Sequence, residues 1–277
     1  MNKLTLLHKI TYSALFIALG ILLSRFLSLP AIFGLPFLKV SLAVSVIIFS
    51  SLFLGPLWGG LIGFLVDFFG AILVPQGGSY DFLYSIPAFL EGFVPYFIYK
   101  LLFKLKVDKK YPIVLSILIF LFLMIVVTFT LTHDTFSYTQ TSKKYEFTPT
   151  LKTLICSLFT ILGIIYILLS VLIFKKYKKN NFNNAYRIYL IASSVLLTFL
   201  IVKIPLSSLI FTYRLGYSYE IIFGTRTLSG FLTSIVHTFL IVVMLDLTLR
   251  LKKKGSIYFD DSNLNLENKE NNENGRK

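Results

Sequence analysis

Long apolar runs, separated by short polar or basic stretches, dominate the chain. A helix needs about 20 apolar residues to cross a hydrocarbon layer of ~30 Å, and most of the runs reach or approach that length. The pattern therefore predicts about eight helices, at residues 10–29, 40–54, 57–74, 83–103, 111–131, 151–174, 186–210 and 225–249. The second and third runs are short for full spans, which leaves a tilted or partly re-entrant path open for one of them.

Prolines and a lysine within the apolar runs predict where the helices bend or are interrupted. Pro87 and Pro95 predict kinks in the fourth run, and Lys203 and Pro205 interrupt the seventh. Residues 251–277 are polar and rich in asparagine, so they cannot bury enough apolar surface to fold alone. We expect residues 1–250 to form a membrane domain and residues 251–277 to form a disordered cytoplasmic tail.

Composition supports an all-α integral membrane protein. Of the 277 residues, 56% are hydrophobic and only 14% are charged, with a mean hydropathy of +0.77. The net charge of +14 does not indicate a nucleic-acid partner, because the basic residues cluster between apolar runs as loop charges do in membrane proteins. The single cysteine, Cys156, excludes a disulfide within the chain and a cysteine metal cluster. The first apolar run has no good cleavage site, so we interpret it as a retained helix.

The distribution of basic residues predicts the orientation in the membrane. With the N-terminus in the cytoplasm and the runs alternating, 19 of the 27 basic residues fall on the inner side and eight on the outer side. Both termini are therefore predicted to be cytoplasmic, in a multi-pass protein of the cell membrane. Four of the outer residues lie at or near the ends of apolar runs: Arg25, Lys39, Lys203 and Arg226. Such a group could attract an anionic solute, or its members could reach lipid phosphates or cap helix ends.

The densest chemical pattern lies in residues 55–67, at the start of the third run. It places four glycines close together, Gly55, Gly59, Gly60 and Gly63, and these small residues predict close approach of helix backbones. Asp67 follows within the same apolar run, where an ionisable residue suggests function. Asp67 could accept hydrogen bonds from a solute, or it could serve helix packing or charge pairing.

Aromatic and polar residues follow the third run. Tyr80, Phe82 and Tyr84 could stack on a flat heterocycle, although an interfacial aromatic belt explains them equally well. Gln76 is a possible polar contact in a Gly-rich turn, and Glu91 could pair with a basic residue or contact solute.

Catalysis finds little support in the sequence. His8, His133 and His237 are scattered, and no zinc-binding, nucleophile-elbow or phosphate-loop motif occurs. We predict no catalytic residue, no metal and no cofactor.

Several of these segments together resemble one family. Ala14-Leu-Phe-Ile-Ala18 forms a small-residue strip on the first helix. Together with four other parts of the chain, this strip resembles the substrate-binding (S) components of energy-coupling factor (ECF) transporters, folate type. The other parts are residues 30–41, 55–70 and 75–80, and the stretch from Tyr186 in which Arg226 opens the last helix. The resemblance covers residues 8–105 and 186–250, and residues 55–70 are its most specific part.

The resemblance implies a six-helix protein that captures a vitamin, folate-like, from outside with high affinity. It implies docking through Ala14 and Ala18 to a coupling membrane subunit that carries two ATP-binding subunits, so ATP hydrolysis would occur only in partners. Outer loops would close over the solute, and the module would topple to release it. Residues 106–185 depart from the pattern and are interpreted as an inserted transmembrane hairpin. The solute-binding candidates are Arg25, Lys39 and Arg226 for carboxylates, Asp67 and Tyr80 for a ring, and Gln76 as a further polar contact.

Two other functions remain open at this point. A stand-alone secondary transporter would need an internal inverted repeat, and no clear repeat relates the two halves. A membrane enzyme acting on lipid headgroups would need histidines or carboxylates clustered at one interface, and the charges do not cluster so in sequence.

Overall fold

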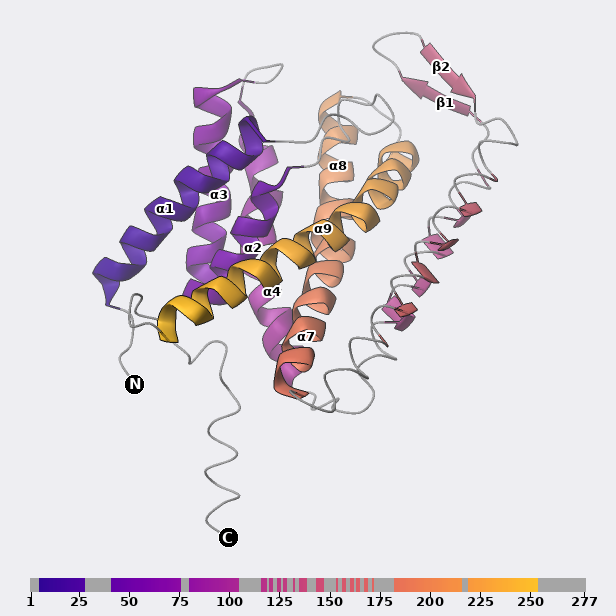
Figure 1. Cartoon of the computed structure of the whole chain (residues 1–277). Helices are drawn as coiled ribbons and strands as arrows, with labels where there is room; N and C mark the ends of the chain where they lie inside the picture. The colour runs from indigo at the N-terminus through magenta and orange to yellow at the C-terminus, as the bar shows by residue number, and fades with distance from the viewer. Residues whose placement is uncertain are drawn as a thin grey trace. The chain divides into compact units, whose positions relative to one another are not determined.

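The computed structural model of the chain describes residues 5–27, 41–75, 80–104, 182–215 and 219–253, with single residues and short stretches between 116 and 171. These residues, coloured by their position along the chain in Figure 1, fall into two compact units. Unit 1 comprises residues 1–29, 41–97 and 239–277. Unit 2 comprises residues 30–40 and 98–238.

Helices form at every described apolar run, as the hydrophobic pattern predicts. The elements are α1 (Leu6–Arg25), α2 (Ala43–Leu54), α3 (Pro56–Leu73), η3 (Phe82–Tyr84), α4 (Ser85–Lys104), β1 (Thr135–Tyr138), β2 (Lys143–Glu146), α7 (Phe182–Thr198), η4 (Phe199–Lys203), α8 (Ile204–Leu215) and α9 (Tyr219–Lys253). The described residues of 116–132 and of 153–171 are helical as well. The prediction of a helical membrane protein is confirmed.

Within the described residues, four helices are long and apolar enough to cross a membrane: Leu6–Arg25, Pro56–Leu73, Phe82–Lys104 and Arg187–Arg214. Ala43–Leu54 and Thr233–Thr248 are shorter apolar helices. The total of about eight spans stays a prediction, because several of the expected spans lie partly outside the described residues.

Helix α2 is buried on every side. All twelve of its residues are buried, and Ile48 is fully inaccessible. At about 1.5 Å per residue the helix is ~18 Å long, well short of the hydrocarbon layer. This agrees with the sequence, in which the second run was short and carried no charge.

Gly55 makes the turn between α2 and α3. Its φ of 103° and ψ of 169° lie in a region that essentially only glycine adopts, and Pro56 then begins α3 with its fixed φ. A Cβ at Gly55 would meet nothing within 4 Å. The sequence suggested close packing at Gly55, but its role is the backbone turn.

We expect Gly55→Ala to lower the free energy of unfolding by about 1–3 kcal/mol, because the new side chain is strained by the backbone alone. Thermal unfolding in detergent would measure the loss. Gly55→Gln should lose about as much as Gly55→Ala, since the site is open. A loss that grows with side-chain size would show instead that crowding, and not backbone strain, selects glycine here.

The other glycines of α3 let three helices touch. A Cβ at Gly59 would lie 2.5 Å from the carbonyl oxygen of Gly92 and 2.5 Å from Cα of Ser51. A Cβ at Gly63 would lie 2.2 Å from the carbonyl oxygen of Ala88. The backbone of α3 therefore lies against both α2 and α4, which confirms the close approach that the glycine spacing predicts.

Helix α1 packs on the same unit through aromatic rings. The Phe16 ring meets Phe49 and Phe53 edge-on, with centroids 5.7 and 5.9 Å apart. Further along α1, a Cβ at Gly20 would lie 2.6 Å from Val66 of α3. One face of α1 is thereby fixed against α2 and α3.

In unit 2 a π-helical turn joins α7 to α8. The sequence predicts an interruption at Lys203 and Pro205, but the helix continues through both residues. Proline lacks an N–H and crowds the carbonyl one turn before it, and the wider π turn at residues 199–203 accommodates this. The Ser207 hydroxyl donates to the carbonyl oxygen of Lys203, which satisfies one acceptor in this turn.

A short antiparallel strand pair occurs in the polar stretch between the fifth and sixth runs. Thr135 lies opposite Glu146, and Tyr138 lies opposite Lys143. Strands of four residues are too short to stand out among long apolar runs, so the hydrophobic pattern did not predict this pair.

Candidate functional site

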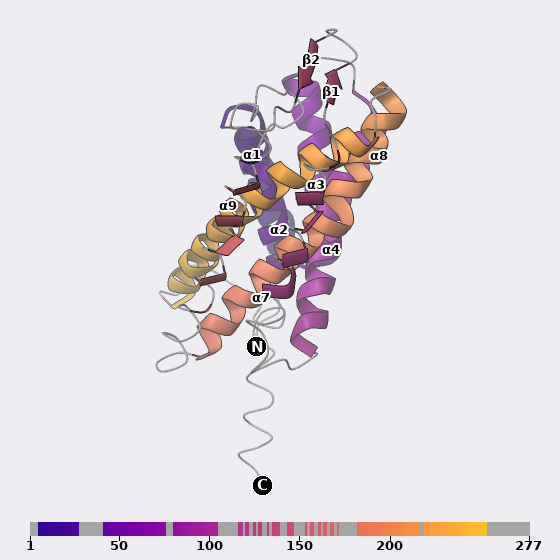
Figure 2. The same cartoon turned by 90° about the vertical axis from the view of Figure 1, so that its right-hand side faces the viewer.

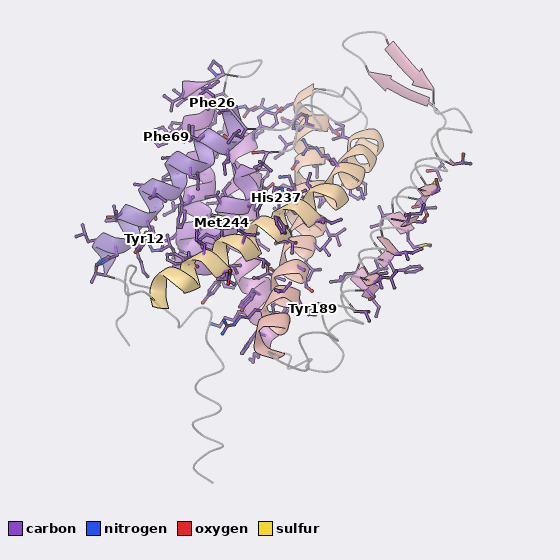
Figure 3. The ribbon with its side chains drawn as sticks, viewed as in Figure 1. Tyr12, Phe26, Phe69, Tyr189, His237 and Met244 are labelled. Carbon is purple, nitrogen blue, oxygen red and sulfur yellow. The ribbon has the colours of Figure 1, made fainter. Side chains whose placement is uncertain are left out.

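Three helix termini of unit 1 meet at one end of the unit. Arg25 is the last residue of α1, Asp67 lies in the C-terminal part of α3, and Ser85 is the first residue of α4. In Figure 3, Phe26 and Phe69 mark the C-terminal ends of α1 and α3 at this end, whereas Tyr12 lies at the other end of α1. The sequence predicted Arg25 and Asp67 as site residues, and the fold places Arg25 against Gly70 of α3, three residues beyond Asp67.

A hydrogen-bond chain joins Tyr80, Ser85 and Asp67. The Ser85 hydroxyl donates to Oδ2 of Asp67 at 2.6 Å, and the Tyr80 hydroxyl lies 2.7 Å from the same serine oxygen. Ser85 is completely buried, while Asp67 and Tyr80 are half-buried. Two predicted site residues, Asp67 and Tyr80, are thus connected through a third residue.

Arg25 lies against the backbone of α3. A Cβ at Gly70 would lie 2.8 Å from Nε of Arg25, so the absence of a side chain there leaves room for the guanidinium. Among the described residues, Nε of Arg25 is buried and has no hydrogen-bond partner. A buried N–H without a hydrogen-bond partner costs about 1–3 kcal/mol. A solute that brings an acceptor to Nε of Arg25 would remove this cost.

Aromatic rings flank the polar chain. The Tyr80 ring meets Phe68 edge-on with centroids 5.2 Å apart. Phe68 stacks on Phe64 at 6.0 Å, and Phe64 in turn meets Phe82 at 5.8 Å. The rings of α3 and of the segment before α4 therefore form one aromatic cluster beside the Asp67 carboxylate.

This arrangement combines a cation, a carboxylate and flat apolar surfaces at one end of a helical unit. Arginine binds carboxylates with two parallel hydrogen bonds, and aromatic rings favour stacked or edge-on contact with other rings. The chemistry suits a small solute that has both a ring and an acidic group. In the part of the chain that the structure describes, no three His, Cys, Asp or Glu side chains group as a metal site.

The remaining predicted solute contacts lie outside the described residues or in unit 2. Lys39 and Gln76 lie outside the described residues. Arg226, in α9, belongs to unit 2, where its guanidinium lies 4.5 Å from the centroid of the Phe211 ring. The predicted convergence of Arg25, Lys39 and Arg226 therefore stays a prediction.

Two buried polar residues were missed or undervalued in the sequence. Ser85 carries no signal of its own, since a serine near a helix start is common. His237 looked isolated, but in unit 2 it is 1% exposed and its ring lies 5.5 Å from Phe199, over which the Lys203 ammonium sits at 5.0 Å. Figures 1 and 2 both show α9 crossing α8, and a Cβ at Gly230 of α9 would lie 3.3 Å from Ile204 and 3.4 Å from Phe199.

The small-residue strip of α1 faces away from the unit 1 core. Ser13, Phe16 and Gly20 are buried, whereas Ala14 and Ala18 are exposed on the opposite side of the helix. The strip is therefore exposed among the described residues. A flat strip of this kind allows another helix to approach closely in lipid.

Fold and site together define a multi-pass helical membrane protein with a polar site at one end of a helical unit. A family model described as ECF transporter, substrate-specific component, matches residues 8–149, from the start of α1 to just beyond β2. The match covers slightly more than half of the 277 residues, and the chain belongs to this family of transporter subunits. No curated protein and no solved structure matches the chain.

Proposed function

We propose that this chain is the high-affinity recognition subunit of an ATP-driven vitamin importer, and that its solute is a folate-like, acidic heterocycle. Family membership supports a substrate-specific component that associates with ECF subunits and a small substrate. The single observation that carries the solute class is the cluster of Arg25, Asp67, Ser85 and Tyr80 beside the Phe64 and Phe68 rings.

The roles within the site follow from the chemistry of each side chain. Arg25 binds a solute carboxylate, because its buried Nε–H has no hydrogen-bond acceptor among the described residues. Asp67 and Tyr80 contact the solute ring system, which rests on the Phe68 side of the cluster. Lys39, Gln76 and Arg226 are retained as further candidate solute contacts.

The orientation and the energy source complete the proposal. Both termini face the cytoplasm, so the ends of α1 and α3 that carry Arg25 and Asp67 face outward to capture solute. Ala14 and Ala18 dock a coupling membrane subunit. Two ATP-binding partner subunits supply the energy for release.

Thermal-shift measurements test the proposal. The purified protein is titrated with each member of a panel of B vitamins and related acidic heterocycles. A true solute raises the unfolding temperature with a dependence on its concentration that mass action dictates. No stabilisation by any acidic heterocycle would overturn the proposed solute class.

For the stabilising solute, we expect Arg25→Ala to weaken binding about 10- to 100-fold, the loss typical of a charged hydrogen bond. Isothermal titration in detergent would measure the change in Kd. Arg214→Ala is the matched control, because Arg214 is an exposed basic residue at the end of α8. Equal effects of the two variants would show that general charge, and not a contact at Arg25, governs binding.

A further inference from the structure

We propose that Ser85 fixes the hydrogen-bond polarity of the solute site, so that the Tyr80 hydroxyl can only accept from a solute. The solute then presents an N–H or amino donor to Tyr80 and Asp67, and an acidic group to Arg25. This inference rests on the proposed function, because it names which edge of the solute the same site selects.

The direction of the hydrogen-bond chain follows from counting protons. An ionised carboxylate only accepts hydrogen bonds, and a serine hydroxyl has one proton to donate. Since Ser85 gives that proton to Oδ2 of Asp67 at 2.6 Å, the 2.7 Å contact with Tyr80 must be donated by the tyrosine. The Tyr80 hydroxyl proton is therefore used in the hydrogen bond to Ser85 and is not available to a solute.

Tyr80 and Asp67 therefore offer a solute hydrogen-bond acceptors and no donor. The Tyr80 oxygen keeps lone pairs, and within the described residues Oδ1 of Asp67 takes no hydrogen bond. Arg25, which has only donors, lies against Gly70 of α3, three residues beyond Asp67, and selects the opposite kind of group. A solute with a donor and an acidic group on one ring satisfies both sides.

Ser85 is held well enough to impose this direction. It is 0% exposed, so water does not compete for its hydroxyl. Its backbone N–H donates to the carbonyl oxygen of Phe82, at the junction between η3 and α4. The hydroxyl therefore has a fixed position between two helices, α3 and α4.

The polarity can be measured without solute. The C–O stretching band of tyrosine differs between a phenol that donates and one that only accepts, and subtraction of the Tyr80→Phe infrared spectrum assigns the band of Tyr80. We expect a donating phenol in the wild-type protein and a changed band in Ser85→Ala. A Tyr80 band that shows no donation, or that Ser85→Ala leaves unchanged, would overturn the inference even if solute binds as proposed.

The selectivity is tested with two fragments of one size, 4-aminobenzoate and 4-nitrobenzoate, by ligand-observed NMR. Both have a ring and a carboxylate, but only the first has a donor at the far end. We expect the amino compound to bind the wild-type protein about tenfold more tightly, and Ser85→Ala to lose this preference. Ser24→Ala is the matched control, because the Ser24 hydroxyl donates only to the Ile21 carbonyl within α1.

The outcomes separate the inference from the proposed function. Equal binding of the two fragments to the wild-type protein, or a preference that survives Ser85→Ala, would overturn the polarity while the vitamin panel still identifies a solute. A panel without any stabilising compound would remove the proposed function, and the infrared bands would then decide the direction of the chain alone.

Discussion

With leucine at both Ala14 and Ala18, we expect the chain to fold and bind solute but to lose, on purification, the coupling subunit that we propose as its partner. Both alanines are exposed and lie opposite the face of α1 that buries Ser13, Phe16 and Gly20. Both positions are exposed among the described residues, but leucine there separates two helix backbones that the small residues allow to touch. Overpacking at such a contact costs about 1–3 kcal/mol, which is about 5- to 150-fold in affinity.

The measurement is the amount of coupling subunit that co-purifies per molecule of this chain after co-expression. Leu61→Trp serves as the control for added bulk, because Leu61 is 49% exposed on α3 of the same unit. The control should retain the coupling subunit. Retention by the double-leucine variant, with the thermal shift of the solute intact, would place the docking surface elsewhere on the chain.

The helices could be predicted because a bilayer leaves few alternatives. Backbone groups in hydrocarbon must be satisfied within the segment, so an apolar run of sufficient length becomes a helix. The predicted run at residues 57–74 and the observed α3, Pro56–Leu73, differ by one residue at each end. Proline and glycine set those ends, and their effects are local and therefore visible in the sequence.

The hydrogen-bond chain at the site could not be predicted in the same way. Asp67 stood out because a carboxylate in an apolar run is costly. Ser85, its partner 18 residues later, has no such cost and no periodic position, so only the packing of α4 on α3 reveals the bond. Long-range pairs of common residues leave little trace in one sequence.

The π turn shows a different limit. Lys203 and Pro205 correctly mark a disturbance in the seventh run, but they do not say what form it takes. The helix absorbs the proline by widening at residues 199–203 instead of breaking, and the buried Phe199 and His237 rings then pack beside it. The outcome depends on neighbours in α9, which the run itself does not contain.

We expect Gly63→Ala to destabilise the protein clearly more than the same methyl group added at Gly230. The new Cβ would lie 2.2 Å from the carbonyl oxygen of Ala88, and a backbone atom cannot rotate away as a side chain can. Helices α3 and α4 must then separate, which weakens the contacts that bring Ser85 to Asp67. Overpacking costs about 1–3 kcal/mol, enough to lower the unfolding temperature by several degrees.

Gly230→Ala is the matched control, since it adds the same methyl group to a buried helical glycine. Its Cβ would meet only side-chain atoms of Ile204 and Phe199, at 3.3 and 3.4 Å, and these can shift by small amounts. We expect little loss there, because alanine also favours the helix over glycine by up to about 1 kcal/mol. The unfolding temperatures of both variants, measured in one detergent, test this prediction. Equal losses of stability would mean that α3 and α4 are not packed backbone to backbone. The site that depends on their contact would then lose its support.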